Sequence, residues 1–350
     1  DVAVMAGVSD AVVSYTLNGR APVAPATAER VREAIRTLGY RPNHTARALK
    51  SGSSGAIALI APRGEDPAFT NPFFTEFAAT AEDLARRRGF AFYMASYALD
   101  RETVVDRLQE FADRQVDGAL IIPDDRRDRR SVAAIDAVGV PWVQVDTVDP
   151  IPGASTVGAD LYRGGVDATT HLADHGHRRI GYVGHVGDEP RHRAWQDTCR
   201  RLGLDPGPAL PARFTREGGY AAASRMVRAG DLPPALFAAS DLVALGVLRA
   251  FHEAGVAVPD DVALVSFDGS WEAEYSWPAL TSVRQPIEEM ADAALTQLLA
   301  ADSADSSEPT DPPDAADGLE ASDGLAQRHR RERHSVFPGR LVLRASCGTH

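Results

Sequence analysis

The sequence predicts a small all-α unit followed by a larger α/β unit built from two doubly wound parallel sheets. Two observations support this fold class. The first fifty residues contain three short segments with the spacing of a helix-turn-helix unit. From residue 55 onward, apolar runs alternate with amphipathic segments, which is typical of parallel strands covered on both faces by helices. These runs are too numerous for one sheet, so we expect two subdomains.

The first two predicted helices lie within residues 1–17. Ala3 is small enough to let a second helix cross closely, and Gly7 suits a turn with a left-handed backbone. Val13 is placed to pack the two helices together. Ser9 precedes the second helix and can cap it, which leaves the first turn of that helix free to face the major groove of DNA.

The third predicted helix runs from Thr27 to Leu38 and ends at Gly39. Its apolar face carries Val31, Ile35 and Leu38. Three short helices with this spacing form a unit that reads DNA, so the pattern favours a gene regulator over a generic helical hairpin.

The motifs of the first 52 residues resemble the headpiece and hinge of the LacI/GalR family of bacterial transcription regulators. GVS, SYTLN, LGYRPN and A-R-x-L occur in the order and at the spacing of that family. The resemblance implies a helix-turn-helix headpiece over residues 1–42 and a hinge helix with linker over 43–54. It also implies these DNA-binding positions: Ser9, Asp10, Ala11, Ser14, Tyr15, Asn18, Thr27, Asn43, Ala46 and Leu49.

Three positions depart from the family pattern. The family normally has a few residues before Asp1, including a hydroxyl residue that caps the first helix, so we expect that the N-terminus is truncated. Tyr15 stands where many relatives carry an arginine that reads bases, so the operator sequence cannot be carried over. Ala24 replaces a hydroxyl cap and removes one phosphate contact.

The hinge is expected to order only on DNA. Asn43 can cap a short helix that extends to Lys50, but eight residues form too short a helix to be stable alone in water. We expect it to pair with the hinge of a dimer mate in the minor groove. There Leu49 would insert into a central base step and bend the DNA.

The charge of the chain differs by region. The net charge of -12 looks wrong for a protein that binds phosphates, but residues 1–50 carry +3. Residues 300–324 carry -8 and contain no basic side chain. Residues 302–324 are acidic, of low complexity and rich in Pro, Ser and Ala, which predicts a disordered insertion. Its composition favours a solvated loop over a regulatory tail.

The α/β unit is expected to span residues 55–350, with an N-terminal subdomain near 55–154 plus 284–300 and a C-terminal subdomain near 155–283 plus 335–346. Phe337–Ser346 resembles the closing strand of the family. The predicted strands are Ala56–Ala61, Ala91–Tyr97, Gly118–Ile122, Trp142–Asp146, Ile180–Gly184, Leu236–Ser240 and Val262–Phe267. The predicted helices are Phe73–Arg88, Glu102–Arg114, Leu161–His175, His192–Leu202, Gly219–Ala229, Leu242–Glu253 and Ile287–Leu299.

Polar and aromatic residues gather where these strands end, which is where open α/β sheets bind ligands. Carboxylates and an arginine bond hydroxyls in pairs, while phenyl rings stack on the apolar face of a sugar or on a base. A small-molecule effector is therefore expected, with a sugar preferred and a purine or nucleoside as the alternative. The candidate effector-binding residues are Phe73, Phe74, Asp146, Arg191, Phe214, Ser240, Asp241 and Asp268.

Simpler interpretations remain open for some of these residues. Phe73 or Phe74 can belong to the core, and Asp241 or Asp268 can merely cap helices. NPFF, the run from Arg191 to Trp195, ASDLVALG and SFDG match motifs of the family, and in relatives those positions line the effector pocket. The resemblance thus implies a periplasmic-binding-protein-like effector domain. Ser240 stands where asparagine is usual and Ala194 where glycine is usual, which leaves the ligand undetermined.

Other motifs do not support a catalytic or metal site. The spacing of His171 and His175 would allow a zinc site, but the sequence around His175 and His177 is typical of the end of a helix. No acidic residue or cysteine nearby can be identified as a further ligand. The glycines near His185 lack the spacing of a dinucleotide loop, and no G-x-S-x-G surrounds Ser240. We therefore expect no cofactor, no metal and no enzyme activity.

The remaining expectations concern location and partners. Two distant cysteines do not form a disulfide framework, and no signal peptide or membrane span is visible, so a cytoplasmic protein is expected. The predicted partners are double-stranded operator DNA, a small-molecule effector and a second copy of the chain in a homodimer. A periplasmic solute-binding protein would share the two-lobed fold but would need a signal peptide and would not need residues 1–52.

Overall fold

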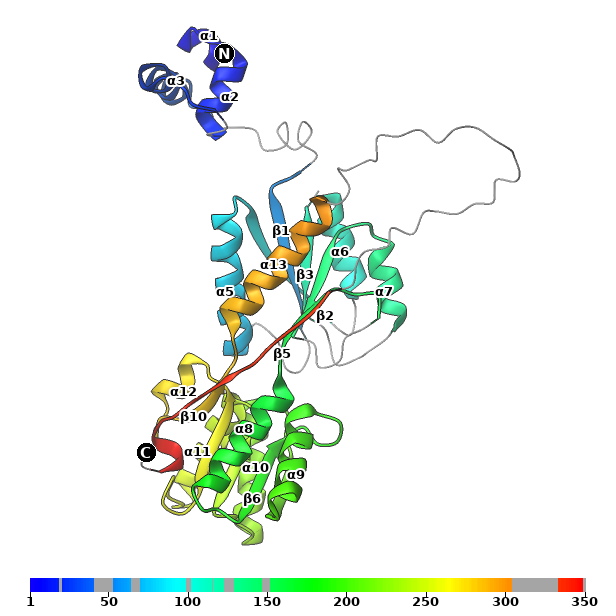
Figure 1. The fold of residues 1–350 in the computed structure, drawn as a ribbon, viewed down its shortest axis with the longest axis vertical. Coiled ribbons are helices and arrows are strands. Elements are labelled where there is room, and N and C mark those ends of the chain that lie inside the picture. The colour runs from blue at the N-terminus through cyan, green and yellow to red at the C-terminus, as the bar shows by residue number, and fades with distance from the viewer. Residues whose placement is uncertain are drawn as a thin grey trace, which may run out of the picture. The chain divides into compact units, whose positions relative to one another are not determined.

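The chain divides into two compact units, Asp1–Ser54 and Gly55–His350 (Figure 1). The computed structural model describes residues 1–18, 21–40, 53–63, 70–98, 102–114, 116–122, 129–146, 152–303 and 333–348. At residues 17–18, 129–131 and 301–303 it describes the backbone alone. The expected hinge residues Asn43, Ala46 and Leu49 lie outside the described residues, as does nearly all of the acidic segment.

The first unit consists of three helices around a small apolar core. The helices are α1 (Val2–Ala6), α2 (Asp10–Asn18) and α3 (Pro25–Leu38). Gly7 ends α1 with φ of 63°, the left-handed backbone that the sequence suggested there, and Gly39 ends α3 with φ of 54°. The core contains Val2, Ala3, Ala6, Val13, Val31 and Ala34.

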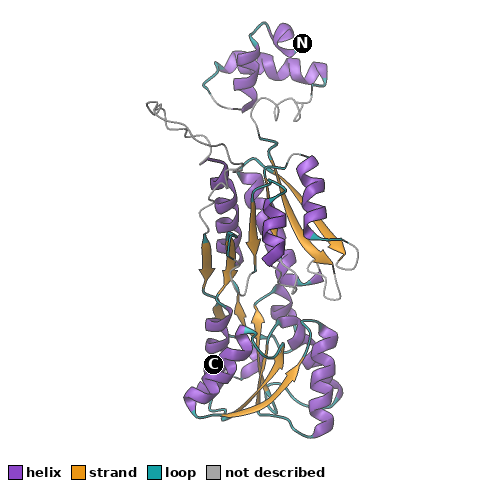
Figure 2. Cartoon of the chain, turned by 90° about the vertical axis from the view of Figure 1, so that its right-hand side faces the viewer, coloured by secondary structure: helices purple, strands orange, loops and turns teal. Residues whose placement is uncertain are grey.

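The first subdomain of the second unit is a sheet covered by helices (Figures 1 and 2). All its strands are parallel, and their order is β11-β5-β4-β3-β1-β2. Ile57 and Leu59 face the same core as α5 and α13, while Ala58 and Ile60 face that of α6 and α7. The strands are β1 (Ala56–Arg63), β2 (Ala91–Ala98), β3 (Gly118–Ile121), β4 (Trp142–Val145), β5 (Thr156–Ala159) and β11 (His334–Phe337). The helices are α5 (Pro72–Arg87), α6 (Val104–Asp113), α7 (Arg129–Asp136) and α13 (Ile287–Ser303).

The second subdomain is built on a sheet in the order β12-β10-β9-β8-β6-β7, in which only β12 runs antiparallel to its neighbour. Helices α8 and α9 pack together on one side of it, and α10 and α11 on the other. The strands are β6 (Arg179–Gly184), β7 (Asp205–Pro211), β8 (Ala235–Ala238), β9 (Ala263–Asp268), β10 (Thr281–Arg284) and β12 (Arg340–Val342). The helices are α8 (Leu161–Asp174), α9 (Pro190–Leu202), α10 (Arg216–Ala229), α11 (Asp241–Glu253), α12 (Trp271–Tyr275) and the 3-10 turn η2 (Ala345–Cys347).

The predicted fold class is confirmed. Within the described residues, every predicted strand and helix except the closing strand is present to within a few residues. Sequence analysis missed the strands β5, β7 and β10 and the helices α7 and α12. Within the described residues, no helix has both the length and the apolar character that a membrane span requires.

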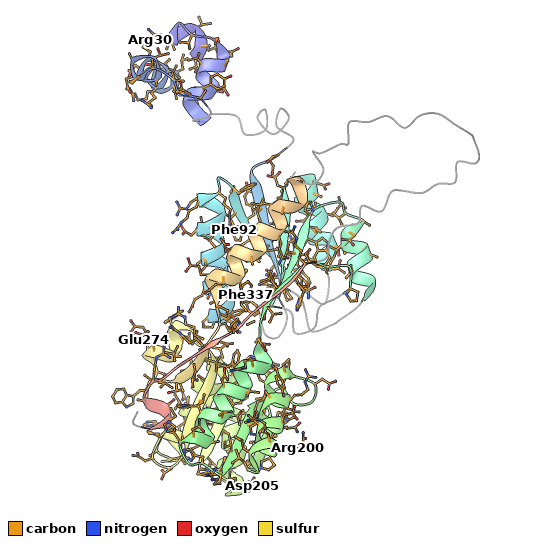
Figure 3. All side chains as sticks on the ribbon, in the orientation of Figure 1. Arg30, Phe92, Arg200, Asp205, Glu274 and Phe337 are labelled. Carbon is orange, nitrogen blue, oxygen red and sulfur yellow. The ribbon has the colours of Figure 1, made fainter. Side chains whose placement is uncertain are left out.

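The expected subdomain boundary is wrong at two strands. β5 pairs with β4 and β11 pairs with β5, so both strands belong to the first sheet rather than to the C-terminal subdomain. The expected closing strand is interrupted at Pro338 and Gly339, and only β12 joins the second sheet. Figure 3 labels Phe337 on β11 in the first subdomain and Asp205 at the start of β7 in the second.

Candidate functional site

The exposed face of α2 is formed by two rows of residues at helical spacing. Asp10 and Ser14 make one row, Ala11 and Tyr15 make the other, and all four are exposed while Val13 is buried. The backbone N–H of Val12 donates to Ser9 Oγ over 3.4 Å, which is the cap that the sequence predicted.

Two further predicted DNA-binding residues of the headpiece, Thr27 and Asn18, are not among these four exposed residues. Thr27 is half-buried in the first turn of α3, whose N-terminus has no side-chain cap at Ala24. The side chain of Asn18 lies outside the described residues.

A cleft of about 560 Å³ opens in the second subdomain at the carboxyl ends of β6 and β7. This is the edge at which the sequence predicted a ligand site, and Arg191 and Phe214 both line it. The full lining is His185, Val186, Asp188, Glu189, Pro190, Arg191, Pro211, Ala212, Arg213 and Phe214.

Arg191 is the buried cation of this cleft. Its Nε donates to Glu189 Oε1 over 2.6 Å and its Nη1 donates to the carbonyl of Ala239 over 2.9 Å. The guanidinium also lies 4.5 Å from the centre of the Phe214 ring. Burial opposes the charge, yet Glu189 and Asp268 together raise the pKa of Arg191 above its ordinary value, so the side chain stays cationic.

Asp268 ends β9 and lies next to Arg191, with its Oδ1 4.0 Å from Arg191 Nη1. The same oxygen accepts a hydrogen bond of 2.9 Å from Gln285 Nε2. Burial, followed by the charge of Asp241, raises the pKa of Asp268 well above its ordinary value, and Asp146 adds to this effect.

Asp268 and Asp146 also share an unusual backbone conformation. Their φ angles are 101° and 59°, and they are the two non-glycine residues of the described chain with a left-handed backbone. Such strain is typical of functional positions.

The comparisons with known proteins decide the family. A model of "Bacterial regulatory proteins, lacI family" matches residues 1–43, and a model of "Periplasmic binding protein-like domain" matches residues 169–316. The HTH-type transcriptional regulator CelR of Thermobifida fusca is 35% identical over 300 residues, which cover 83% of this chain and 87% of CelR. The chain belongs to the LacI family.

Other relatives agree with this assignment. The HTH-type transcriptional repressor PurR of Haemophilus influenzae is 30% identical over 305 residues, which cover 85% of this chain and 89% of PurR. A solved CelR–cellobiose complex shares 30% identity and aligns with a TM-score of 0.68 over 99% of this chain and 98% of CelR. The lac repressor dimer bound to operator has the same fold, with a TM-score of 0.76 at 21% identity over 100% of this chain and 98% of its own. This LacI-family protein is a DNA-binding transcriptional regulator.

Asp241 does not have the geometry of a ligand-binding residue in this LacI-family regulator. Its Oδ1 accepts from Ser266 Oγ over 2.6 Å and from Ser282 Oγ over 2.7 Å. Its Oδ2 accepts from the backbone N–H and the hydroxyl of Ser270 over 2.7 and 2.8 Å. Both oxygens are therefore occupied, and the carboxylate joins β9, β10 and the start of α12. Burial raises the pKa of Asp241, and these hydrogen bonds oppose the rise.

Ser240 and the phenylalanines of NPFF have structural partners as well. Ser240 is buried and its Oγ accepts from the N–H of Val243 over 3.2 Å, so it caps α11. Phe73 is 2% exposed and belongs to the core, with its ring edge-on to Phe74 at 5.0 Å. Of the two alternatives left open for the pair, Phe73 fits the core, and Phe74 is half-buried beside it.

The cleft is also lined by Glu189 and His185, which the sequence did not identify as site residues. Glu189 caps α9 through the N–H of His192 at 3.0 Å and also accepts from the Tyr182 hydroxyl at 3.1 Å. The His185 ring lies 4.2 Å from the Phe214 ring. An acidic residue followed by Pro190 is a recognisable helix start, and that signal could have identified Glu189. No local pattern singles out His185.

The histidines that resembled zinc ligands have other neighbours. The rings of His171 and His175 lie 4.4 Å apart, and His171 Nε2 lies 3.3 Å from Cys347 Sγ. Within the described part of the chain, no three His, Cys, Asp or Glu side chains are arranged to hold a metal ion. Cys199 and Cys347 are both buried, and neither forms a disulfide within the described part of the chain.

Proposed function

We propose that this regulator is a cytoplasmic homodimeric repressor that releases a near-palindromic operator when a sugar binds beside Arg191. The observation that carries the proposal is the buried guanidinium of Arg191, held between the Phe214 ring and the carboxylate of Asp268. A guanidinium that donates and a carboxylate that accepts can together bind a pair of neighbouring hydroxyls. An adjacent phenyl ring suits the apolar face of a sugar ring.

The size of the cleft and one relative support a sugar. A volume of about 560 Å³ lies within the range of small-molecule sites. The relative CelR was solved in complex with cellobiose. A purine or nucleoside remains the second candidate, because Phe214 could stack on a base. His185 and Arg191 both lie against the Phe214 ring, so a base or a sugar that stacks on this ring would have to displace one of them.

The DNA-binding half of the proposal rests on α2. Its exposed rows, which include Ala11 and Tyr15, would enter the major groove of each half-site. Dimerisation is supported by β2, an edge strand that exposes 50% of Tyr93 and 51% of Met94. Exposed apolar edge strands invite pairing, and a second copy would cover this one.

Two experiments test the proposal on the full chain. The first is a thermal-shift screen against sugars, nucleosides and purines, in which a sugar should raise the melting temperature of the wild type but not of Arg191→Ala. The second is footprinting on the DNA upstream of its own gene, which should show a two-fold symmetric site. A sugar response retained in both Arg191→Ala and Asp268→Ala would place the effector elsewhere. An asymmetric or sequence-independent footprint would contradict the operator model.

A further inference from the structure

A carboxylate stands at the tip of the exposed face of α2. Asp10 is the first residue of that helix, is exposed, and lies one turn before Ser14 on the same row. The first turn of a recognition helix is the part that comes closest to base edges. A negative charge is unexpected there, because DNA presents a dense row of phosphates.

The described residues of the headpiece do not neutralise this charge. Arg32 and Arg36 on α3 are paired with Glu29 and Glu33 of the same helix. Among the side chains described in residues 1–16 and 21–40, none forms a hydrogen bond or ion pair with the Asp10 carboxylate. A helix N-terminus favours an acidic residue, so stability alone is the competing explanation for its presence.

The groove itself offers a partner for a carboxylate. In the major groove, the amino groups of cytosine N4 and adenine N6 are the only hydrogen-bond donors, and guanine and thymine present acceptors. The adenine amino group lies between two acceptors, N7 of the same base and O4 of the paired thymine, which both repel a carboxylate. The cytosine amino group has an acceptor on one side only, because its other neighbour is the C5–H edge.

We propose that Asp10 accepts a hydrogen bond from the N4 amino group of one cytosine in each operator half-site. The carboxylate then acts as a specificity determinant in two ways. It is satisfied only where that cytosine is present, and it repels every site where an acceptor takes its place. The inference rests on the proposed function, because it requires α2 to be the recognition helix.

The experiment begins with the full-length wild type and a library of randomised 20-base-pair duplexes. Selection gives a preferred operator, and every base pair of one half-site is then replaced in turn by the other three, with affinities measured by fluorescence anisotropy. The variants are Asp10→Ala and Asp10→Asn. Glu33→Gln is the matched control, because it removes the same charge from the exposed face of α3.

The wild type should prefer C·G at one position by about tenfold, and Asp10→Ala should reduce that preference to about twofold or less at that position alone. Asp10→Asn should gain affinity for A·T there, because an asparagine amide pairs with adenine N6 and N7. Glu33→Gln should raise affinity for random DNA without changing any base preference.

Two outcomes would overturn the inference, and they are distinguishable. If the wild type selects an operator but Asp10→Ala retains the full cytosine preference, Asp10 does not read a base while the proposed function stands. If the wild type selects no sequence at all, both the inference and the operator model fail. Far-ultraviolet circular dichroism of each variant verifies that the headpiece remains folded.

Discussion

At the scale of single residues, Asp268 combines three features that oppose the stability of the folded protein. Its carboxyl is buried, its backbone is left-handed, and the charges of Asp241 and Asp146 oppose its ionisation. Arg191 and Gln285 compensate for this only in part. A side chain that costs folding free energy in this way is typical of a binding position rather than of a core residue.

Replacing Asp268 with asparagine should therefore stabilise the folded protein. The ordinary pKa of 3.8 applies to the unfolded chain, whereas the folded chain holds the proton to higher pH. As pH rises from about 4 through the raised pKa, the unfolded chain loses its proton first and folding becomes less favourable. Asp268→Asn should remove this loss, raise the unfolding free energy at pH 7 by about 1 kcal/mol, and abolish the sugar response. Urea unfolding of both proteins between pH 4 and 8 measures the unfolding free energies. If Asp268→Asn is no more stable than the wild type at pH 7, the Asp268 carboxylate does not destabilise the folded protein.

Asp241 should behave in the opposite way. Asp241→Ala leaves the hydroxyls of Ser266, Ser270 and Ser282 without their buried acceptor, which should cost about 3 kcal/mol of unfolding free energy. Asp231→Ala is the control, because Asp231 is an exposed partner of Arg179 and its loss should cost less than about 1 kcal/mol. Equal losses in the two variants by urea unfolding would mean that the serine network is not stabilising.

The same pair of aspartates marks what the sequence could reveal at this scale. Both follow apolar strands, and on that pattern both were expected at the ligand. The difference between them depends on serines from β9, β10 and the start of α12, which come together only in the folded sheet. No local spacing links Asp241 to Ser282, 41 residues away.

At the scale of elements, several candidate effector-binding residues lie at or near helix N-termini. Asn71 caps α5, Glu189 caps α9 and Ser240 caps α11, each just after a strand or its loop. Strands with mostly apolar residues could be predicted even at four residues, as in β3, β4 and β8. β5 (TVGA) and β10 (TSVR) lack such a run, because threonine and glycine interrupt β5 and three of the four residues of β10 are polar. β7 reads DPGPALP, and its three prolines argue against a strand except at a sheet edge, which is where it lies.

The cap of α9 should be more important for ligand binding than for the helix itself. Glu189→Ala removes the acceptor of His192 N–H and also the carboxylate that fixes Arg191 Nε. We expect effector affinity to fall by about tenfold or more and the unfolding free energy to fall by about 3 kcal/mol, because a buried cation loses its partner. Calorimetric titration with the sugar found in the screen measures the affinity.

Thr103→Ala is the control for this prediction. Thr103 caps α6 in the first subdomain through a hydrogen bond from Asp106 N–H, so its loss should cost about 1 kcal/mol and leave effector affinity unchanged. If Glu189→Ala binds the sugar as tightly as Thr103→Ala does, Glu189 does not position Arg191.

At the scale of the whole molecule, sheet membership was the least predictable feature. The expected boundary at residue 155 followed chain order, but β5 joins the first sheet between β4 and β11 before the chain enters the second sheet. β11 and β12 are three residues apart in sequence yet join different sheets. Strand pairing between residues 178 positions apart, such as His334 and Thr156, depends on tertiary packing that no local pattern encodes.

The second unit also contains a direct link between its subdomains. The backbone N–H of Trp271, at the start of α12, donates to Glu76 Oε1 on α5 over 2.9 Å. This bond joins the segment that follows Asp268 to α5, which contains Phe73 in its first turn. A ligand bound at Asp268, as proposed, would lie three residues from a contact between the two subdomains, and a contact of this kind could couple effector binding to their relative position.

Effector and operator should consequently affect each other by the same factor. If the sugar weakens operator binding of the wild type by about tenfold, saturating operator must weaken sugar binding by about tenfold, because the two bindings form one thermodynamic cycle. Anisotropy with labelled operator, at zero and at saturating sugar, gives the first ratio, that of the two operator affinities. Calorimetric titration of sugar, with and without operator, gives the second ratio, that of the two sugar affinities. Arg191→Ala should bind operator like wild type and show a first ratio of one. A sugar that tightens operator binding would instead identify a corepressor, and unequal ratios would mean that a further state of the protein takes part.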